Sequence, residues 1–328
     1  MTYSSGGLIQ ATDYNGFVST TAGANVNATW STGATNSGWG QTALGTVAAA
    51  GTVTATQWAS LVNTLSSMGS QTGTTITSRT APVAGNLISV LANVNTDLTN
   101  CYTNRGNAVG SGTQVGTFSG TTSKTTATGS GQTTWTITFT HTVTFPSADQ
   151  ARYFFNAGGI VKIQYGKSST GTDIDPDWNT FAGQCGSINI TGGAQTIAAQ
   201  AYTGTTRLGG TGGTQTTLAT TTGWYALTGT PVTIFQLNNA SSPYTGEYIR
   251  TQASASATVL TLTTTWVQPA VSATGTTCNI SGGTGISSPS TTPTVSNGAP
   301  TTLVNYVPPS TTYLTNTWGT PSIAASVA

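Results

Sequence analysis

The stretch Trp135-Thr-Ile-Thr-Phe-Thr-His-Thr-Val-Thr-Phe145 decides the fold, because it carries the clearest regular pattern in the chain. Aromatic and aliphatic residues, with His141 among them, alternate strictly with threonine along it. Successive side chains of a strand point to opposite faces of the sheet, so this pattern predicts a β-strand with one buried face. Threonine suits the other face, because β-branched side chains pack well on a pleated sheet.

The residues that follow predict a short helix and a second strand. Pro146 ends the first strand, and Ser147 is a residue type that favours the N-cap of a helix, here one that runs through Phe154. The glycine pair at 158–159 closes that helix, and the apolar residues of 159–165 predict a returning strand. Strand, helix, glycine turn and strand form one coherent unit.

Four more strands are predicted downstream of this unit. Two of them, at 224–227 and 232–237, flank a turn at 228–231. The other two, at 248–257 and 258–267, alternate small and apolar residues. Short strands at this spacing are typical of an antiparallel sandwich or a small barrel.

The N-terminal third of the chain follows the period of a helix instead. One helix is predicted after Thr56, where apolar residues recur at helical spacing as far as Gly69. A second is predicted from Asn86 to Asn104, and a third over 13–30. Their narrow apolar stripes favour helices that pack in a hairpin against a neighbour.

These patterns together predict an α+β fold, in which an N-terminal helical segment precedes a mainly antiparallel β-sandwich-like domain and an extended C-terminal arm. The arm is rich in Ser, Thr, Gly and Pro, and we expect its isolated aromatic residues, Tyr306, Tyr313 and Trp318, to anchor it across neighbouring subunits. The expected boundaries are 1–110 for a helical assembly region, 111–134 for a Gly/Ser/Thr-rich linker or hairpin, 135–268 for the β domain and 269–328 for the arm.

The composition predicts a protein that associates with copies of itself. Charged residues make up 5% of the chain, against about a quarter in typical domains, and the net charge is +1. A nearly neutral surface of hydroxyl and amide groups is poor at keeping copies apart. We therefore expect a homo-oligomer, most plausibly a trimer or hexamer, with other structural proteins as further partners. A secreted, protease-tolerant surface protein is the alternative that composition leaves open.

The cysteines and the charge pattern narrow the class of protein. Cys101, Cys185 and Cys278 are odd in number and far apart, so they form neither a disulfide framework nor a zinc motif, and free thiols suit assembly in a reducing cytoplasm. The N-terminal residues lack the basic and apolar regions of a secretory signal, and no apolar run approaches the roughly 20 residues of a membrane span. Lysine and arginine are scattered singly, which disfavours nucleic-acid binding.

One acidic stretch is a candidate cation site. Asp173, Asp175 and Asp177 alternate within Gly-Thr-Asp-Ile-Asp-Pro-Asp-Trp, a spacing at which three carboxylates of a loop can converge on Ca²⁺. Trp178 stands where an EF-hand needs glycine, and Gln184 stands where it needs a bidentate glutamate. The alternative is a turn followed by the start of a helix, where aspartate is favoured. We favour the second interpretation and predict no metal site.

The remaining chemically capable groups give no catalytic pattern. His141 is the only histidine, and its position on the apolar face of a strand predicts a core or interface residue. Glu247 is the only glutamate, and a two-carboxylate glycosidase would need it paired across a cleft. The glycines of 209–213 lack the Gly-Lys-Ser/Thr ending of a phosphate loop and predict a flexible loop. We therefore predict no catalytic residues, no cofactor and no enzymatic activity.

Several short segments of the sequence resemble segments found in one class of proteins. The most specific of them is Arg152-Tyr-Phe-Phe-Asn-Ala-Gly-Gly159, which lies within a longer block over 143–159. The weaker blocks lie at 7–15, 30–33, 38–41, 223–228 and 242–245. Together, over 1–268, they resemble virion structural proteins of tailed phages, notably cyanophages and other marine phages. Trp39 is a small departure, because many of those proteins have tyrosine at that place.

The resemblance implies a structural component of a bacteriophage virion that is assembled in the host cytoplasm. The expected location is the tail, the baseplate or a tail fibre, and head decoration is an alternative. A module that binds a host receptor or glycan at a fibre tip is a second functional possibility, because exposed Trp and Tyr can stack on sugars. A polysaccharide depolymerase is a third, less favoured one.

Overall fold

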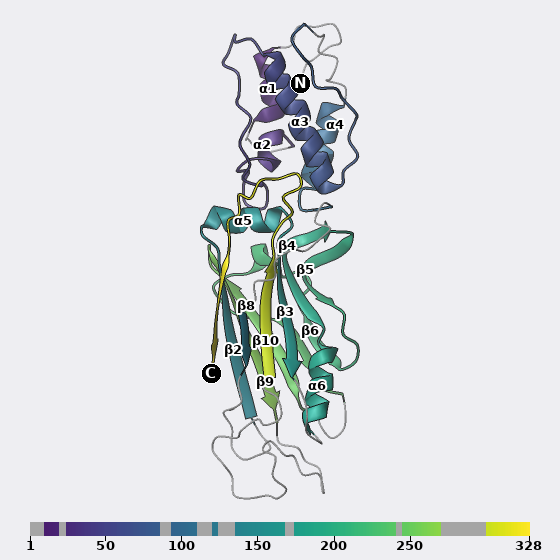
Figure 1. Ribbon diagram of the computed structural model, residues 1–328, viewed down its shortest axis with the longest axis vertical. Coiled ribbons are helices and arrows are strands. Elements are labelled where there is room, and N and C mark those ends of the chain that lie inside the picture. Colours follow the sequence, from purple (N-terminus) through teal and green to yellow (C-terminus); the bar gives the residue numbers. More distant parts are fainter. Residues whose placement is uncertain are drawn as a thin grey trace, which may run out of the picture.

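The computed structural model describes residues 10–19, 24–85, 93–109, 120–123, 135–167, 174–240, 245–269 and 300–328. The helices α1 to α4 lie at one end of the elongated molecule and the two β-sheets lie at the other (Figure 1). Helix α5 lies between these two parts, and α6 packs beside the sheets. The predicted α+β class, with N-terminal helices and a sandwich of antiparallel sheets, is confirmed. In the described part of the chain, no helix is both long enough and apolar enough to cross a membrane.

The N-terminal helices differ in their bounds from the predicted ones. The single helix predicted over 13–30 is two helices, α1 (Ala11–Val18) and α2 (Val26–Thr29), of which α2 starts at an N-cap, Asn25, whose side chain accepts from Ala28 N. The predicted helix over 86–104 is described only as α4 (Val94–Thr103), because 86–92 lie outside the described residues.

The longest helix, α3 (Ala55–Thr72), is confirmed but ends later than predicted. It begins at a capping box in which Thr54 and Gln57 bind each other's backbone N–H. It ends at Gly73 rather than Gly69, because Gly73 adopts a left-handed φ of 66° and donates its N–H to the carbonyl of Gly69. The buried indole of Trp58 on this helix packs edge-on against Tyr14, with ring centroids 5.5 Å apart.

The two sheets are antiparallel throughout the described pairings. The five-stranded sheet contains, in spatial order, β1 (Gly120–Ser123), β10 (Pro300–Val307), β3 (Ile160–Lys167), β4 (Ser187–Ile197) and β5 (Gln200–Leu208). The six-stranded sheet contains β11 (Ser322–Val327), β2 (Trp135–Thr144), β9 (Val259–Gln268), β8 (Tyr248–Ala255), β7 (Val232–Asn238) and β6 (Thr214–Leu218).

The alternating stretch that predicted a strand is β2, and its apolar face lies in the core. Ile137, Phe139 and Val143 are fully buried, while the threonines between them are partly accessible. His141 is also fully buried on this face, opposite Leu262 of β9. The interpretation of this residue as a core histidine is therefore confirmed.

The predicted unit after β2 is confirmed as well, and it builds an aromatic cluster at one end of the sandwich. Ser147 caps α5 (Ala148–Asn156) by accepting from Gln150 N, and β3 follows the glycine turn. Phe155 of α5 stacks on Trp224 with ring centroids 5.0 Å apart, and Phe145 packs edge-on against the same indole. This cluster seats α5 across the end of the sheets.

The strand predicted at 224–227 is wrong. Trp224–Ala226 form a short 3-10 helix, η1, while the partner strand at 232–237 is confirmed as β7. Gly223 lies so close to β4 that an added Cβ would stand 2.6 Å from the carbonyl oxygen of Thr191. The chain has to turn there, because Trp224 enters the aromatic cluster instead of continuing along a sheet.

The strands between β3 and η1 were not predicted. β4, β5 and β6 lie in a Gly- and Thr-rich region, and the glycines of 209–213 form the loop between β5 and β6, as predicted. β4 carries an irregularity in its pairing with β5 between Ile190 and Ala194, which breaks the alternation of side chains that reveals a strand.

The C-terminal residues require a correction, because 300–328 do not form an arm that leaves their own chain. β10 lies between β1 and β3, and β11 pairs with β2. Tyr306 and Trp318 are each 1% exposed inside the same molecule, and only Tyr313 of the three expected anchors is exposed. In the predicted linker 111–134, residues 120–123 are strand β1, and the rest lies outside the described residues.

Candidate functional site

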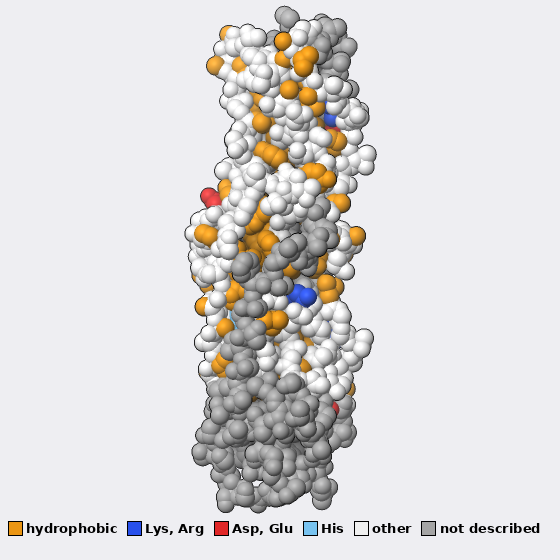
Figure 2. All heavy atoms as spheres, viewed as in Figure 1, with side chains coloured by type: hydrophobic (Ala, Val, Ile, Leu, Met, Phe, Trp, Pro, Cys, Tyr) orange, Lys and Arg blue, Asp and Glu red, His pale blue; other side chains and the backbone are white. Residues whose placement is uncertain are grey.

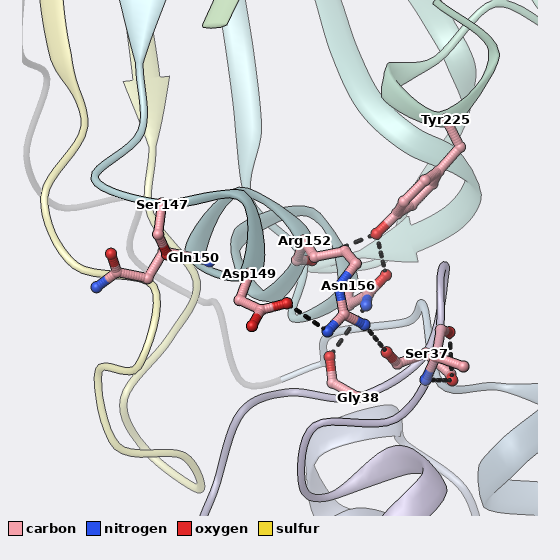
Figure 3. Close-up of polar contacts among 9 residues, drawn as sticks. Ser37, Gly38, Ser147, Asp149, Gln150, Arg152, Asn156 and Tyr225 are labelled. Atoms are coloured by element: carbon pink, nitrogen blue, oxygen red, sulfur yellow. Dashed lines mark hydrogen bonds and ion pairs between the residues drawn. The ribbon is translucent and has the colours of Figure 1, made fainter. Parts of the chain in front are cut away.

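Polar contacts concentrate where the N-terminal helical end meets α5 (Figure 3). The guanidinium of Arg152 donates to the carbonyl of Ser37 at 3.1 Å and pairs with Asp149 at 2.8 Å. The amide of Asn156 donates to the carbonyl of Gly38 at 3.0 Å and accepts from the hydroxyl of Tyr225 at 2.6 Å. Both side chains come from the Arg152–Gly159 block, so this block links the two parts of the molecule.

The loop on the helical side of this contact is held by tryptophan and glycine. Trp39 is fully buried, and its indole N–H points at the carbonyls of Arg105 and Asn156, at 3.1 and 3.2 Å. Gly40 has a φ of +72°, and an added Cβ would stand 2.4 Å from the ring of Tyr153. Any side chain at position 40 would therefore push the loop away from α5.

Two glutamines extend the same contact to other segments. Gln41 donates to the carbonyl of Thr315 at 3.0 Å and accepts from its backbone N–H at 2.9 Å, which ties the loop to the C-terminal segment. Gln195 of β4 donates to the carbonyl of Gly106 at 2.6 Å, just after α4. We call Ser37, Gly38, Trp39, Gln41, Arg152, Asn156, Gln195 and Tyr225 the junction network.

A cavity of about 420 Å³ lies beside the junction network. Its wall includes Asn36, Arg105 and Tyr225, together with the backbone of the glycine pair 192–193. Arg105 lies over the ring of Tyr102 at 4.3 Å and binds the side chain and carbonyl of Asn36 at 3.3 and 3.2 Å. This volume is in the range of small-ligand sites, and the polar wall would suit an uncharged polar molecule such as a sugar.

The junction network links segments of the chain through hydrogen bonds and one ion pair. Burial raises the pKa of the Tyr225 phenol above its usual range, so this group stays a neutral hydrogen-bond donor. Asp149 is the acidic residue that contacts the junction network, and it is exposed and paired with Arg152. His141 lies inside the sandwich on β2, so it does not meet a nucleophile at the junction.

The structure brings together two acidic residues that the sequence analysis considered separately. Asp177 lies on α6 (Ile174–Gln184), and the side-chain amide of Asn239 donates both to it and to Glu247, the latter at 2.8 Å. Burial raises the pKa of Glu247 to about 9, and the nearby Asp177 adds to this rise. Burial also raises the pKa of Asp177. We call these three residues the carboxylate cluster.

The other predicted candidates behave as follows. Asp173 and the side chain of Asp175 lie outside the described residues, so the predicted helix start is confirmed only from Ile174 onward. Cys101 and Cys185 are buried and free, and burial raises the pKa of Cys101 to about 12, which keeps it a thiol. Cys278 lies outside the described residues.

Sequence reasoning missed the junction network and Asn239 as parts of a site. Asn156 lies 118 positions from Gly38, and Asn239 lies 62 positions from Asp177, so no local pattern joins them. Comparison of the chain with protein-family models, with curated proteins and with solved structures gives no match.

Proposed function

We propose that this protein is a structural component of a bacteriophage virion, a part of the tail, baseplate or tail fibre that acts through contacts between subunits. The observation that carries the proposal is the junction network. Its polar side chains bind one another and the backbone of distant segments, so they join the helical end and the sandwich into one elongated unit. A unit of this kind can serve as a rigid spacer that holds neighbouring subunits in place under mechanical load.

The surface supports the same proposal. Charged side chains are sparse on the face shown in Figure 2, and most of the described surface there is uncharged. Among the described residues, the large exposed apolar side chains are Val83, Val109, Val232 and Tyr313, which lie on separate segments. A surface with little charge favours contacts through hydroxyl, amide, backbone and small apolar groups, as in an assembly of many weak contacts.

The edge strand β11 offers such a contact. Within the described residues it pairs with β2 on one side and is hydrogen-bonded to no strand on the other, although β1 of the other sheet lies close to it. Its exposed residues are small, namely Ser322, Ala324, Ala325 and Ser326. An open edge with small side chains is a template for strand addition, so we propose that a neighbouring copy or another virion protein pairs with it.

Light scattering of the purified chain tests the self-association that this function needs. The proposal predicts a stable homo-oligomer, a trimer or a hexamer, which persists on dilution into the micromolar range. A monodisperse monomer at high protein concentration, together with phage particles that an antibody against the chain does not label, would contradict it.

Glycan recognition is a second candidate function, and the cavity at the junction is the observation that favours it. Gly193 lines this cavity, and an added Cβ there meets no atom within 4 Å. The Gly193→Leu variant should therefore fill the cavity without disturbing the fold. Gly166→Leu on β3 is the matched control, because that position is equally open and does not line the cavity.

A glycan array probed with the wild type and both variants decides this second candidate. Binding that Gly193→Leu abolishes and Gly166→Leu retains would support recognition in the cavity. Absence of binding by the wild type, or equal binding by all three proteins, would reject it.

A further inference from the structure

The carboxylate cluster lies where α6 meets the hairpin formed by β7 and β8. Asn239 directly follows β7 and Glu247 directly precedes β8, and the backbone N–H of Asn239 donates to the carbonyl of Glu247 at 2.9 Å. This bond closes the neck of the hairpin. Two members of the cluster are therefore fixed by the same pair of strands, and Asp177 on α6 supplies the third from another element.

Oxygen atoms of two carboxylates converge on one point in this cluster. That point is the Nδ2 atom of Asn239, which contacts Oδ2 of Asp177 and Oε2 of Glu247. A positively polarised amide thus stands between two acidic groups. The two ends of an amide have the same shape, so a half-turn of the Asn239 side chain would place its oxygen beside both carboxylates.

Among the described residues, neither carboxylate of this cluster forms an ion pair with a lysine or arginine. Glu247 is 0% exposed, and its Oε1 atom has no hydrogen-bond partner among the described residues. The two ion pairs in the described part of the chain are Arg79–Asp97 and Arg152–Asp149, and neither includes the cluster. A buried carboxylate beside a second acidic group is unfavourable unless a proton or a cation accompanies it.

We propose that Asp177, Asn239 and Glu247 bind a divalent cation, Ca²⁺ in preference to Mg²⁺, and that this ion fastens α6 to the β7–β8 hairpin. The donor set consists of carboxylate and amide oxygens, which hard cations prefer and softer transition metals do not. Ca²⁺ accepts irregular geometry with water and carbonyl ligands, whereas Mg²⁺ demands a regular octahedron. The ion would also satisfy the buried Oε1 atom of Glu247.

This site differs from the loop of alternating aspartates that the sequence suggested. It uses Asp177 alone from that stretch and draws its other ligands from a hairpin about 60 positions later. Its role is structural, and it does not depend on the proposed place of the protein in a virion.

Thermal unfolding and calorimetry with Ca²⁺ alone, after treatment with a chelator, test the proposal. The wild type should bind one Ca²⁺ per chain and melt at a higher temperature when it is present. Glu247→Gln keeps the size of the side chain and removes its charge, so it should fold without the ion and lose affinity roughly tenfold or more. Asp149→Asn removes an exposed carboxylate elsewhere and should bind as the wild type does.

Three results would overturn the proposal. The first is a wild type that shows neither heat nor a shift in melting temperature at millimolar Ca²⁺. The second is an unchanged response in Glu247→Gln. The third is a response that Asp173→Asn or Asp175→Asn abolishes and Glu247→Gln preserves, because the ion would then be held by the aspartate loop. A stronger response to Mg²⁺ than to Ca²⁺ would overturn the stated preference.

Discussion

Asn156 is a single side chain that connects three segments, because its amide donates to Gly38 while its oxygen accepts from Tyr225. The residue is 4% exposed, so neither partner has easy access to water as a replacement. Removing one member of a buried hydrogen-bonded set leaves the others unsatisfied, which costs more than the net value of the bond itself. Single side chains of this kind are where the two parts of the molecule are joined.

We predict that Asn156→Ala lowers the free energy of unfolding by about 1–3 kcal/mol, because the Gly38 carbonyl loses its donor and the Tyr225 hydroxyl keeps only a long bond of 3.4 Å to the carbonyl of Arg152. Urea unfolding followed by tryptophan fluorescence measures the change. Asn179→Ala, at an exposed position of α6, is the control and should change stability by less than about 0.5 kcal/mol. Equal, small effects of both variants would show that the junction does not depend on Asn156.

Among the elements, β11 allows a test of the proposed subunit contact, because the direction of each of its backbone N–H groups follows from its pairing with β2. Thr138 of β2 and Ala328 exchange two backbone hydrogen bonds, so the N–H groups of Ala324 and Ser326 also point toward β2. The N–H of Ala325 therefore points away from the sheet. We predict that Ala325→Pro removes a donor from the open edge and converts the oligomer to smaller species, with the fold preserved.

The matched control for that edge variant is Ala324→Pro, which removes an N–H that bonds within the molecule. It should lower the melting temperature through loss of a ladder hydrogen bond. Light scattering and thermal unfolding of both proteins separate the two effects. If Ala325→Pro keeps the oligomeric state of the wild type, the subunits do not associate through the outer edge of β11.

The elements also show which parts of the fold a sequence can predict. β2 and α5 were predictable because their patterns, an alternation and an N-cap before apolar residues, are local. β10 was not, because its place between β1 and β3 depends on partners far away in the chain. The 3-10 helix at Trp224–Ala226 was mistaken for a strand, since its apolar residues fit a strand and only packing against Phe155 turns the chain.

The candidate sites were less predictable than the fold. Asp177 and Glu247 were each noticed in the sequence, but their meeting depends on α6 lying beside the β7–β8 hairpin. Polar residues at a junction have no periodicity, because each is selected by a partner in another segment. Three of the short blocks quoted from the sequence, at 38–41, 152–159 and 223–228, mark the junction, because each of them supplies members of the junction network.

The whole molecule is an elongated unit with helices α1 to α4 at one end, the sandwich at the other and the junction network between them (Figure 1). Its low charge and its open strand edge favour association, and its buried thiols are protected from chance oxidation. These properties suit a repeated building block of a particle more than a free-standing catalyst. We propose on these grounds that the protein works as one copy among many in a phage virion.

A reconstruction of the intact phage particle whose genome encodes this chain tests that claim most directly. We expect symmetric copies of the elongated molecule in the tail, the baseplate or a fibre, in contact with one another. A complete reconstruction in which every density belongs to other chains would contradict it.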